Sequence, residues 1–286
     1  MKIAFFGASG MLGTPVANRL AQDGHELKAL LRNVKTSSLP QACEIIQGDL
    51  KDIDAVRKTI LGCNAIYISL SVAQSSREKD FQPEREGILN ILQIAAQENI
   101  KAIGYLSSLV QNYQGMNGFD WWAFRIKNEA VEMISAHPIP SLIFRPSTFM
   151  ENFDLGSYQQ AGNIALAGTS EHPMYFIAAA DYAKMVSNAF RLFDGKNEEY
   201  IIQGPEAYIA DDAARIFTKH YTKKRMLILK LPFWTLQFFG KLTPKFNYGA
   251  NIVEALNKFP ERFQGTATWE KLGKPELNLE EYARMK

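Results

Sequence analysis

A short apolar run at the start of this chain leads directly into three glycines, Gly7, Gly10 and Gly13. Residues 2–6 are apolar and rich in aromatic side chains, which is typical of a buried parallel strand. Apolar residues then recur at helical spacing over residues 12–20. A strand, a sharp turn and a helix in this order predict a βαβ unit whose turn binds the diphosphate of a dinucleotide.

Each glycine has a separate expected role. Gly7 allows the chain to turn off the strand, and Gly10, lacking a Cβ, allows a diphosphate to approach the backbone. Gly13 allows the helix to pack closely on the sheet. The amide groups of the first helical turn, aligned with the helix dipole, favour an anion there. The alternative is a turn whose glycines serve the fold alone.

Strands and helices are expected to alternate along the chain. The apolar runs predict strands at residues 26–31, 44–47, 65–70, 102–106, 141–144 and 200–203. Helical spacing and N-capping residues predict helices over 52–60 with Asp52 as N-cap, from Pro83 onward, over 120–135, and over 181–190 with Asp181 as N-cap. This alternation indicates an α/β fold, a Rossmann-type doubly wound parallel sheet with helices on both faces.

The regular pattern divides the chain into two parts. Residues 1–150 form the predicted dinucleotide-binding core, to which the chain returns at about 176–204. Residues 151–175 and 205–286 form a smaller, mostly helical substrate lobe. Ligands are expected at the carboxyl ends of the strands.

The end of the second strand bears on cofactor choice. A site for NAD usually places an acid there to bind the ribose 2′-hydroxyl, but this strand ends in Arg32. A guanidinium suits a 2′-phosphate, so NADP(H) is favoured over NAD(H), with a solvated surface arginine as the alternative. Asp49 after the third strand is expected to meet the adenine amino group or to form a turn.

Several motifs together resemble the atypical short-chain dehydrogenase/reductase superfamily, and within it the NmrA-like and isoflavone-reductase-like proteins. They are GASGMLG, ALLRN, GDL, YLSS, KNE, FRPSTFMENF and ADYAKMV, spread over about residues 1–210. The resemblance implies a Rossmann core that binds NADP(H), for reduction of a small molecule or as a sensed ligand. The cofactor-binding residues predicted from motif and resemblance are Gly7, Ser9, Gly10, Met11, Leu12, Gly13, Arg32, Asp49, Leu50, Ser69, Lys127, Arg145 and Pro146.

Standard members of this superfamily reduce a carbonyl with a Tyr-x-x-x-Lys pair on one helix face. Lys127 matches the lysine, but Ala123 stands where the tyrosine belongs. Lys127 is therefore a candidate acid/base, as the isoflavone-reductase-like resemblance implies, with a plain ribose contact or a solvated lysine as alternatives. Tyr113 is a candidate replacement for the phenol, and Ser108 a candidate for binding the substrate oxygen. If no proton donor exists, the protein binds NADP(H) without turnover.

Three functions remain open. The first is an NADPH-dependent reductase of a small, partly apolar carbonyl or conjugated compound, with an apolar pocket lined by Trp121, Trp122 and Phe124 or by Phe149, Met150 and Phe153. The second is an NADP(H)-binding redox sensor that acts through a protein partner. The third is a nucleotide-sugar epimerase or dehydratase, which usually retains the tyrosine and a tightly held NAD.

Composition and residue spacing bear on nucleic-acid binding, metal binding and cellular location. The net charge of +2 gives no indication of nucleic-acid binding, and none is expected. Cys43 and Cys63 lack metal-type spacing, and the four histidines are scattered, so no metal site is predicted. Because the chain starts at its first strand and has no apolar run of ~20 residues, a cytoplasmic protein without a signal peptide is expected.

A basic, aromatic segment lies near the C-terminus. Residues 213–253 contain no acid, and within them the lysines and arginines of residues 215–245 flank Trp234, Phe238 and Phe239. Such a segment suits a membrane surface or an anionic substrate or partner. We favour packing of its apolar face inside the lobe, with the lysines in water. Oligomeric state is not predicted.

Overall fold

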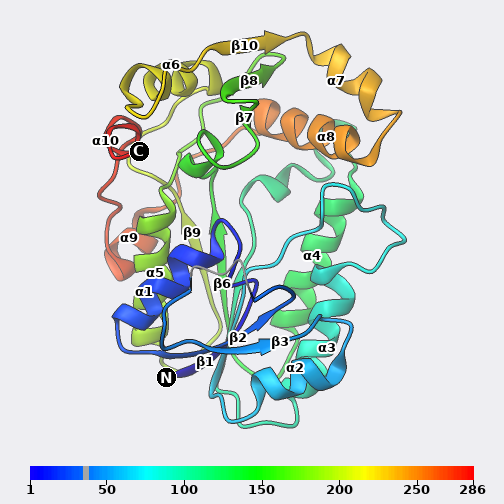
Figure 1. The fold of residues 1–286 in the computed structure, drawn as a ribbon, viewed down its shortest axis with the longest axis vertical. Helices are drawn as coiled ribbons and strands as arrows, with labels where there is room; N and C mark the ends of the chain where they lie inside the picture. Colours follow the sequence, from blue (N-terminus) through cyan, green and yellow to red (C-terminus); the bar gives the residue numbers. More distant parts are fainter. Residues whose placement is uncertain (35–38) are drawn as a thin grey trace.

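The computed structural model describes residues 1–34 and 39–286, and its centre is a seven-stranded sheet in which every neighbouring pair is parallel (Figure 1). The strand order is β3-β2-β1-β4-β5-β6-β9. The strands are β1 (Lys2–Phe6), β2 (Glu26–Leu31), β3 (Glu44–Gln47), β4 (Ala65–Ile68), β5 (Ala102–Leu106), β6 (Ser141–Pro146) and β9 (Glu198–Ile202). The predicted Rossmann-type, doubly wound α/β fold is confirmed.

Helices cover both faces of the sheet (Figure 1). One face carries α1 (Gly13–Gln22), α5 (Ala179–Leu192) and α9 (Thr266–Leu272), and the other carries α2 (Ile53–Ile60), α3 (Ile88–Ala95) and α4 (Trp122–Ser135). Successive side chains of β1 point to opposite faces of the sheet, so β1 contributes to the apolar core on each side. Ile3 and Phe5 pack toward α1 and α5, whereas Ala4 and Phe6 pack toward α2 and α3.

Of the two residues predicted as N-caps, one is confirmed and the other is not. Asp52 is the N-cap of α2, because its side chain accepts from the backbone N–H groups of Asp54 and Ala55. The N-cap prediction for Asp181 is wrong, since α5 begins after Ala178. Asp181 is instead buried, and its Oδ2 accepts hydrogen bonds from two backbone N–H groups of the C-terminal segment, at 3.1 and 2.9 Å.

The helix expected from Pro83 begins with a wider turn. Residues Pro83–Gly87 form a π-helical turn, η1, which continues directly into α3. A π-helical turn changes which residues share a face, and such turns are frequent at functional sites. Here the turn carries a buried acid, Glu84. Short 3₁₀ turns follow at η2 (Val110–Tyr113), η3 (Met116–Gly118) and η4 (Met150–Asn152).

The C-terminal lobe lies at the carboxyl ends of the strands, at the top of Figure 1. Its helices are α6 (Ala210–His220), α7 (Phe233–Gly240), α8 (Pro244–Lys258) and α10 (Leu279–Arg284). It also contains a three-stranded sheet in the order β10-β8-β7, which the sequence pattern did not indicate. Those strands are β7 (Gln159–Gln160), β8 (Asn163–Ala167) and β10 (Ile228–Leu231). No helix among the described residues is long and apolar enough to cross a membrane.

Candidate functional site

The glycine turn joins β1 to α1 beside the end of β4. Gly7 has a φ of +89°, and a Cβ there would lie 2.0 Å from the carbonyl oxygen of Ser69. A Cβ on Gly13 would lie 2.0 Å from the carbonyl oxygen of Gly7. The chain itself therefore requires both glycines, for backbone conformation and for close packing.

Gly10 differs from its two neighbours in the motif. The nearest atom to a Cβ at Gly10 would be the Gly7 carbonyl oxygen, at an ordinary 3.4 Å. Gly10 itself lines a cavity. No contact within the described chain thus demands glycine at this position. A diphosphate lying against the backbone would require glycine here, because a side chain would occupy the space that the ligand needs.

The cavity beside the turn has a volume of about 490 Å³. It lies at the carboxyl ends of β1, β2 and β4, where the strand order reverses between β1 and β4. Seven of the predicted cofactor-binding residues line it: Gly7, Ser9, Gly10, Arg32, Asp49, Leu50 and Ser69. We call it the first cavity.

Arg32 and Asp49 stand at the outer end of the first cavity. Arg32 is exposed and forms no salt bridge with any described residue, so its guanidinium is available to an anionic ligand. Asp49 already serves the turn before α2, because its Oδ1 accepts from the backbone N–H of Lys51 at 3.0 Å. The turn-forming alternative for Asp49 is therefore present, whether or not it also meets an adenine.

A second cavity of about 570 Å³ adjoins the first, and Leu70 and Ser71 line both. It lies between the Rossmann core and α8 of the C-terminal lobe. Its lining includes five of the predicted site residues: Met11, Leu12, Ser108, Lys127 and Pro146. Phe149 also lines it, whereas Met150 and Phe153 are buried in the core of the lobe.

Lys127 reaches the second cavity from α4, but its ammonium is already paired. Its Nζ forms a salt bridge with Oε1 of Glu84, which is 1% exposed. The same oxygen accepts from the hydroxyl of Tyr105 at 2.7 Å, and Glu84 Oε2 accepts from the backbone N–H of Val72 at 3.2 Å. This network holds the Lys127 side chain in place and anchors its charge beside the cavity.

Glu84 is one of the site residues that motif and spacing did not indicate. It stands second in a helix opened by proline, where an acid is ordinary because it complements the helix dipole. Nothing local distinguishes it from a solvated first-turn glutamate. Only the spatial approach of α4 to η1 reveals its role as the partner of Lys127.

The candidate replacement phenol, Tyr113, does not reach the second cavity. It is 1% exposed and packs in an apolar cluster, with its ring centroid 4.8 Å from that of Phe119. Ala123 lies in the same cluster and is 4% exposed. A tyrosine in place of Ala123 would therefore overpack this cluster rather than restore a free phenol.

Another phenol does line the second cavity together with Lys127. Tyr248 comes from α8, and its ring centroid lies 4.9 Å from that of Trp121. Its hydroxyl makes no hydrogen bond with a described residue. Burial, together with the negative charge of Glu84, raises the pKa of Tyr248 to about 12. The phenol is therefore protonated at neutral pH.

The two serines that follow β5 differ in their surroundings, since one bonds within the fold and the other is free to meet a ligand in the second cavity. Ser107 is buried and donates to Gln111 Oε1 at 2.8 Å. Ser108 lines the second cavity, and its hydroxyl makes no hydrogen bond with any described residue. The predicted role of Ser108 in binding the substrate oxygen stays a prediction, and its position in the lining of the second cavity is compatible with it.

Arg145 is placed differently from its prediction. It lines neither cavity, and its Nε donates to Oε1 of Glu199 on the neighbouring strand β9 at 2.6 Å. This pairing accounts for the arginine as a cross-strand contact. Of the Arg145-Pro146 pair, only Pro146 lines the second cavity.

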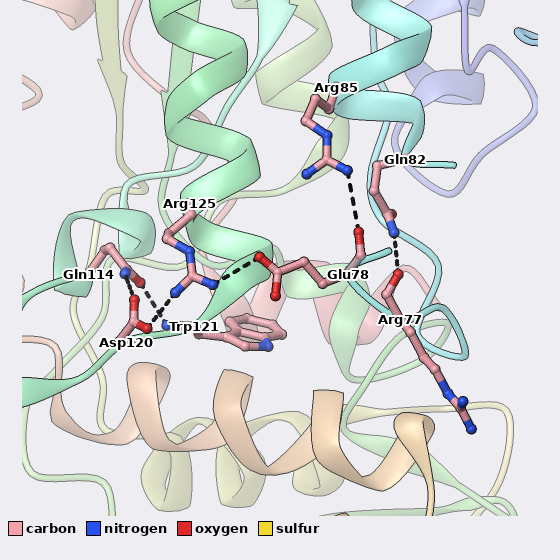
Figure 2. A network of polar contacts seen from close by, with 8 residues as sticks. All are labelled: Arg77, Glu78, Gln82, Arg85, Gln114, Asp120, Trp121 and Arg125. Atoms are coloured by element: carbon pink, nitrogen blue, oxygen red, sulfur yellow. Dashed lines mark hydrogen bonds and ion pairs between the residues drawn. The ribbon is translucent and has the colours of Figure 1, made fainter. Parts of the chain in front are cut away.

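The loop after β4 forms the outer wall of the first cavity and is tied to α4 (Figure 2). Arg125 on α4 donates to Glu78 Oε1 at 2.9 Å and also pairs with Asp120. Arg85 donates to the carbonyl oxygen of Glu78, and Gln82 donates to that of Arg77. Trp121 lies beside this network, above α8 in Figure 2, and lines a third cleft with Trp122 and Tyr248.

The chain belongs to the NmrA-like family, whose model matches residues 1–282. It is 20% identical over 260 residues to the photosystem II assembly factor Ycf39 of Trieres chinensis, which covers 90% of this chain and 80% of that protein. The predicted family membership is thereby confirmed.

Two solved structures share the fold over nearly their whole length. The NADPH-dependent quinone oxidoreductase of Escherichia coli, solved with NADPH, has a TM-score of 0.77 at 18% identity, covering 100% of this chain and 99% of that one. A nucleoside-diphosphate-sugar epimerase of Staphylococcus aureus has a TM-score of 0.74 at 16% identity, covering 99% and 100%. Because a reductase and an epimerase match about equally well, the fold alone does not choose between them.

Proposed function

We propose that this chain is an NADPH-dependent reductase of a small, partly apolar carbonyl or conjugated compound. The observation that carries the proposal is the second cavity, which adjoins the first and presents Ser108, Lys127 and Tyr248 to one space. The nicotinamide half of a bound dinucleotide would itself enter the second cavity, so what favours turnover is the set of hydroxyl and ammonium groups that line that cavity. The similarity to a quinone oxidoreductase that binds NADPH supports the same class of reaction.

The glycine turn and Arg32 are the residues proposed to hold the cofactor. The diphosphate would lie over Gly10, where the chain leaves room, against the uncapped amide groups at the start of α1. Arg32 would bind the 2′-phosphate. Such a cofactor, when bound, supplies a hydride to the substrate.

The second cavity is proposed to bind the substrate and supply the proton. Ser108 would donate to the carbonyl oxygen and orient it. Reduction of a carbonyl or quinone needs a proton on oxygen for each hydride accepted, and the phenol of Tyr248 lines this cavity and carries a proton at neutral pH. Tyr248 is thus the proposed proton donor in place of the missing tyrosine at position 123. Lys127, fixed by Glu84, would hold the cofactor ribose and supply positive charge near the developing oxyanion.

A second candidate is binding without turnover. Ala123 and the similarity to an assembly factor favour it, because that relative is described by assembly rather than by a reaction. The exposed, unpaired Arg32 suits this candidate equally well.

One experiment separates the two candidates. NADPH absorbance decay is followed with a panel of quinones, enals and ketones for the wild type, Tyr248→Phe, Lys127→Met and Ser108→Ala, while cofactor fluorescence reports binding. The reductase proposal expects wild-type turnover, and a rate lower by ~10²–10⁴ in Tyr248→Phe with NADPH still bound. Tight NADPH binding with no turnover across the panel would favour the sensor. Full activity in Tyr248→Phe would remove the proposed proton donor.

A further inference from the structure

The C-terminal lobe carries a large apolar surface that no described part of the chain covers. Seventeen large hydrophobic side chains are exposed among the described residues, and nine of them fall within residues 227–246. They are Leu227, Ile228, Leu229, Leu231, Trp234, Phe238, Phe239, Leu242 and Phe246. We call this set the apolar patch. Trp234 is 66% exposed and Leu242 65%, so most of the surface of each residue is in contact with solvent.

The expectation that this segment packs inside the lobe is therefore wrong. All four residues of β10 are exposed, and among described strands β10 pairs only with β8, on one edge. Of the residues in helix α7 only Gly240 is fully buried, Phe233 and Leu236 are half-buried, and the side chains of Trp234, Phe238 and Phe239 are exposed. Figure 1 places β10 and α7 along one end of the molecule, with α8 beside α7. The side chains of the patch thus come from neighbouring elements at that end of the lobe.

Positive charge flanks the apolar patch at both ends. Lys223, Lys224 and Arg225 precede β10, and Lys241 and Lys245 follow α7. All five are exposed, and none forms a salt bridge with a described residue. No acidic residue occurs anywhere between 213 and 253. A surface with exposed aromatic and leucine side chains and uncompensated lysines complements an anionic lipid surface in both chemistry and charge.

The dimensions allow binding to a membrane surface but not crossing. Helix α7 has eight residues and is about 12 Å long, against the ~30 Å of a bilayer's hydrocarbon core. We propose that β10, α7 and the start of α8 dock the protein on an anionic membrane surface, with the apolar patch inserted at the headgroup level. This proposal is independent of the reductase activity.

Vesicle flotation tests the proposal with the full chain. The vesicles are phosphatidylcholine alone, or phosphatidylcholine mixed with phosphatidylglycerol. We expect flotation with the mixed vesicles, weaker flotation with the neutral ones, and loss of binding as salt is raised. Trp234 emission should shift to the blue on binding, and Trp234→Phe should abolish that shift while keeping flotation.

Two sets of variants separate the apolar and basic contributions. Trp234→Glu with Phe238→Glu should abolish flotation, and removing cations with Lys223→Ala and Arg225→Ala should weaken it about fivefold for each. The matched controls are Leu61→Glu with Leu89→Glu, which are 55% and 50% exposed on the Rossmann core, and Lys58→Ala with Lys101→Ala. These controls should float like the wild type.

Two results would overturn the proposal. One is failure of the wild type to float with the mixed vesicles. The other is a concentration-dependent dimer in analytical ultracentrifugation that Trp234→Glu abolishes, with no flotation, because the patch would then be covered by a second copy of the chain.

Discussion

The two cavities of this protein are built in different ways. The first is formed around one turn, with Gly7, Gly10 and Gly13 spaced along six consecutive peptide bonds and the neighbouring strand ends beside them. The second takes Ser108 from the end of β5, Lys127 from α4 and Tyr248 from α8. A cavity built from one rigid turn is preformed, whereas one assembled across two lobes depends on how the lobes are placed. Cofactor binding should therefore tolerate changes in the lobe that turnover does not.

The largest expected effect tests whether the glycines of the first cavity serve the chain or the ligand. Gly13→Val should prevent stable folding, because its Cβ would overlap the Gly7 carbonyl oxygen. Gly10→Val should fold, since its Cβ has room, and should weaken NADPH binding by at least ~100-fold. Thermal unfolding and NADPH titration measure the two effects. Normal NADPH binding by Gly10→Val would place the diphosphate elsewhere.

A somewhat smaller effect concerns the support of the second cavity. Glu84→Gln removes the charge that compensates Lys127, whose side chain is only 15% exposed. Leaving this cation unpaired should lower the free energy of unfolding by about 3 kcal/mol. Adding Lys127→Met to Glu84→Gln should restore part of that loss, since no buried charge then lacks a partner. Urea unfolding of Glu84→Gln, of Lys127→Met and of the double variant checks this. Additive losses in the double variant would contradict the pairing.

Stability should also depend on pH through Glu151, at the junction of core and lobe. Burial raises the pKa of Glu151 to about 7, and its Oε2 accepts from the N–H of Ala179 at the start of α5. Between pH 4.5 and about 7 the folded chain keeps this proton while the unfolded chain has lost it. Stability from this group therefore falls as pH rises through that window, by about 1.4 kcal/mol per unit.

The variant Glu151→Gln isolates this contribution. Its stability relative to the wild type should increase by roughly 3 kcal/mol between acid and mildly alkaline pH. Urea unfolding of both proteins across that range gives the difference directly. A constant difference would mean that Glu151 titrates normally in the folded chain.

The smallest expected effect concerns cofactor choice at the outer end of the first cavity. Arg32→Ala should remove most of the preference for NADPH over NADH, because a charged contact to phosphate contributes ~1.5–3 kcal/mol, or roughly ten- to a hundredfold in Kd. Binding of NADH should change little. Equal wild-type affinities for the two cofactors would remove the proposed role of Arg32.

The two cavities also differ in how far their residues could be predicted from the sequence. The turn around Gly10 and the capping by Asp52 depend on residues close in sequence, so motif and spacing located them. Glu84 resembles an ordinary first-turn acid and Tyr248 an ordinary helix tyrosine. Only the tertiary fold pairs Glu84 with Lys127 and places Tyr248 in the lining of the same cavity as Lys127. The exposure of α7 also escaped prediction, because an apolar sequence gives no sign of whether another element covers it.

The central claim is that one bound NADPH spans both cavities, and a crystal structure of the protein with NADPH tests it most directly. The account predicts the diphosphate over Gly10, the 2′-phosphate on Arg32, and the nicotinamide in the second cavity beside Lys127, with Tyr248 facing the remaining space. A nicotinamide ring outside the second cavity, or a cavity filled by α8 once the cofactor binds, would contradict it.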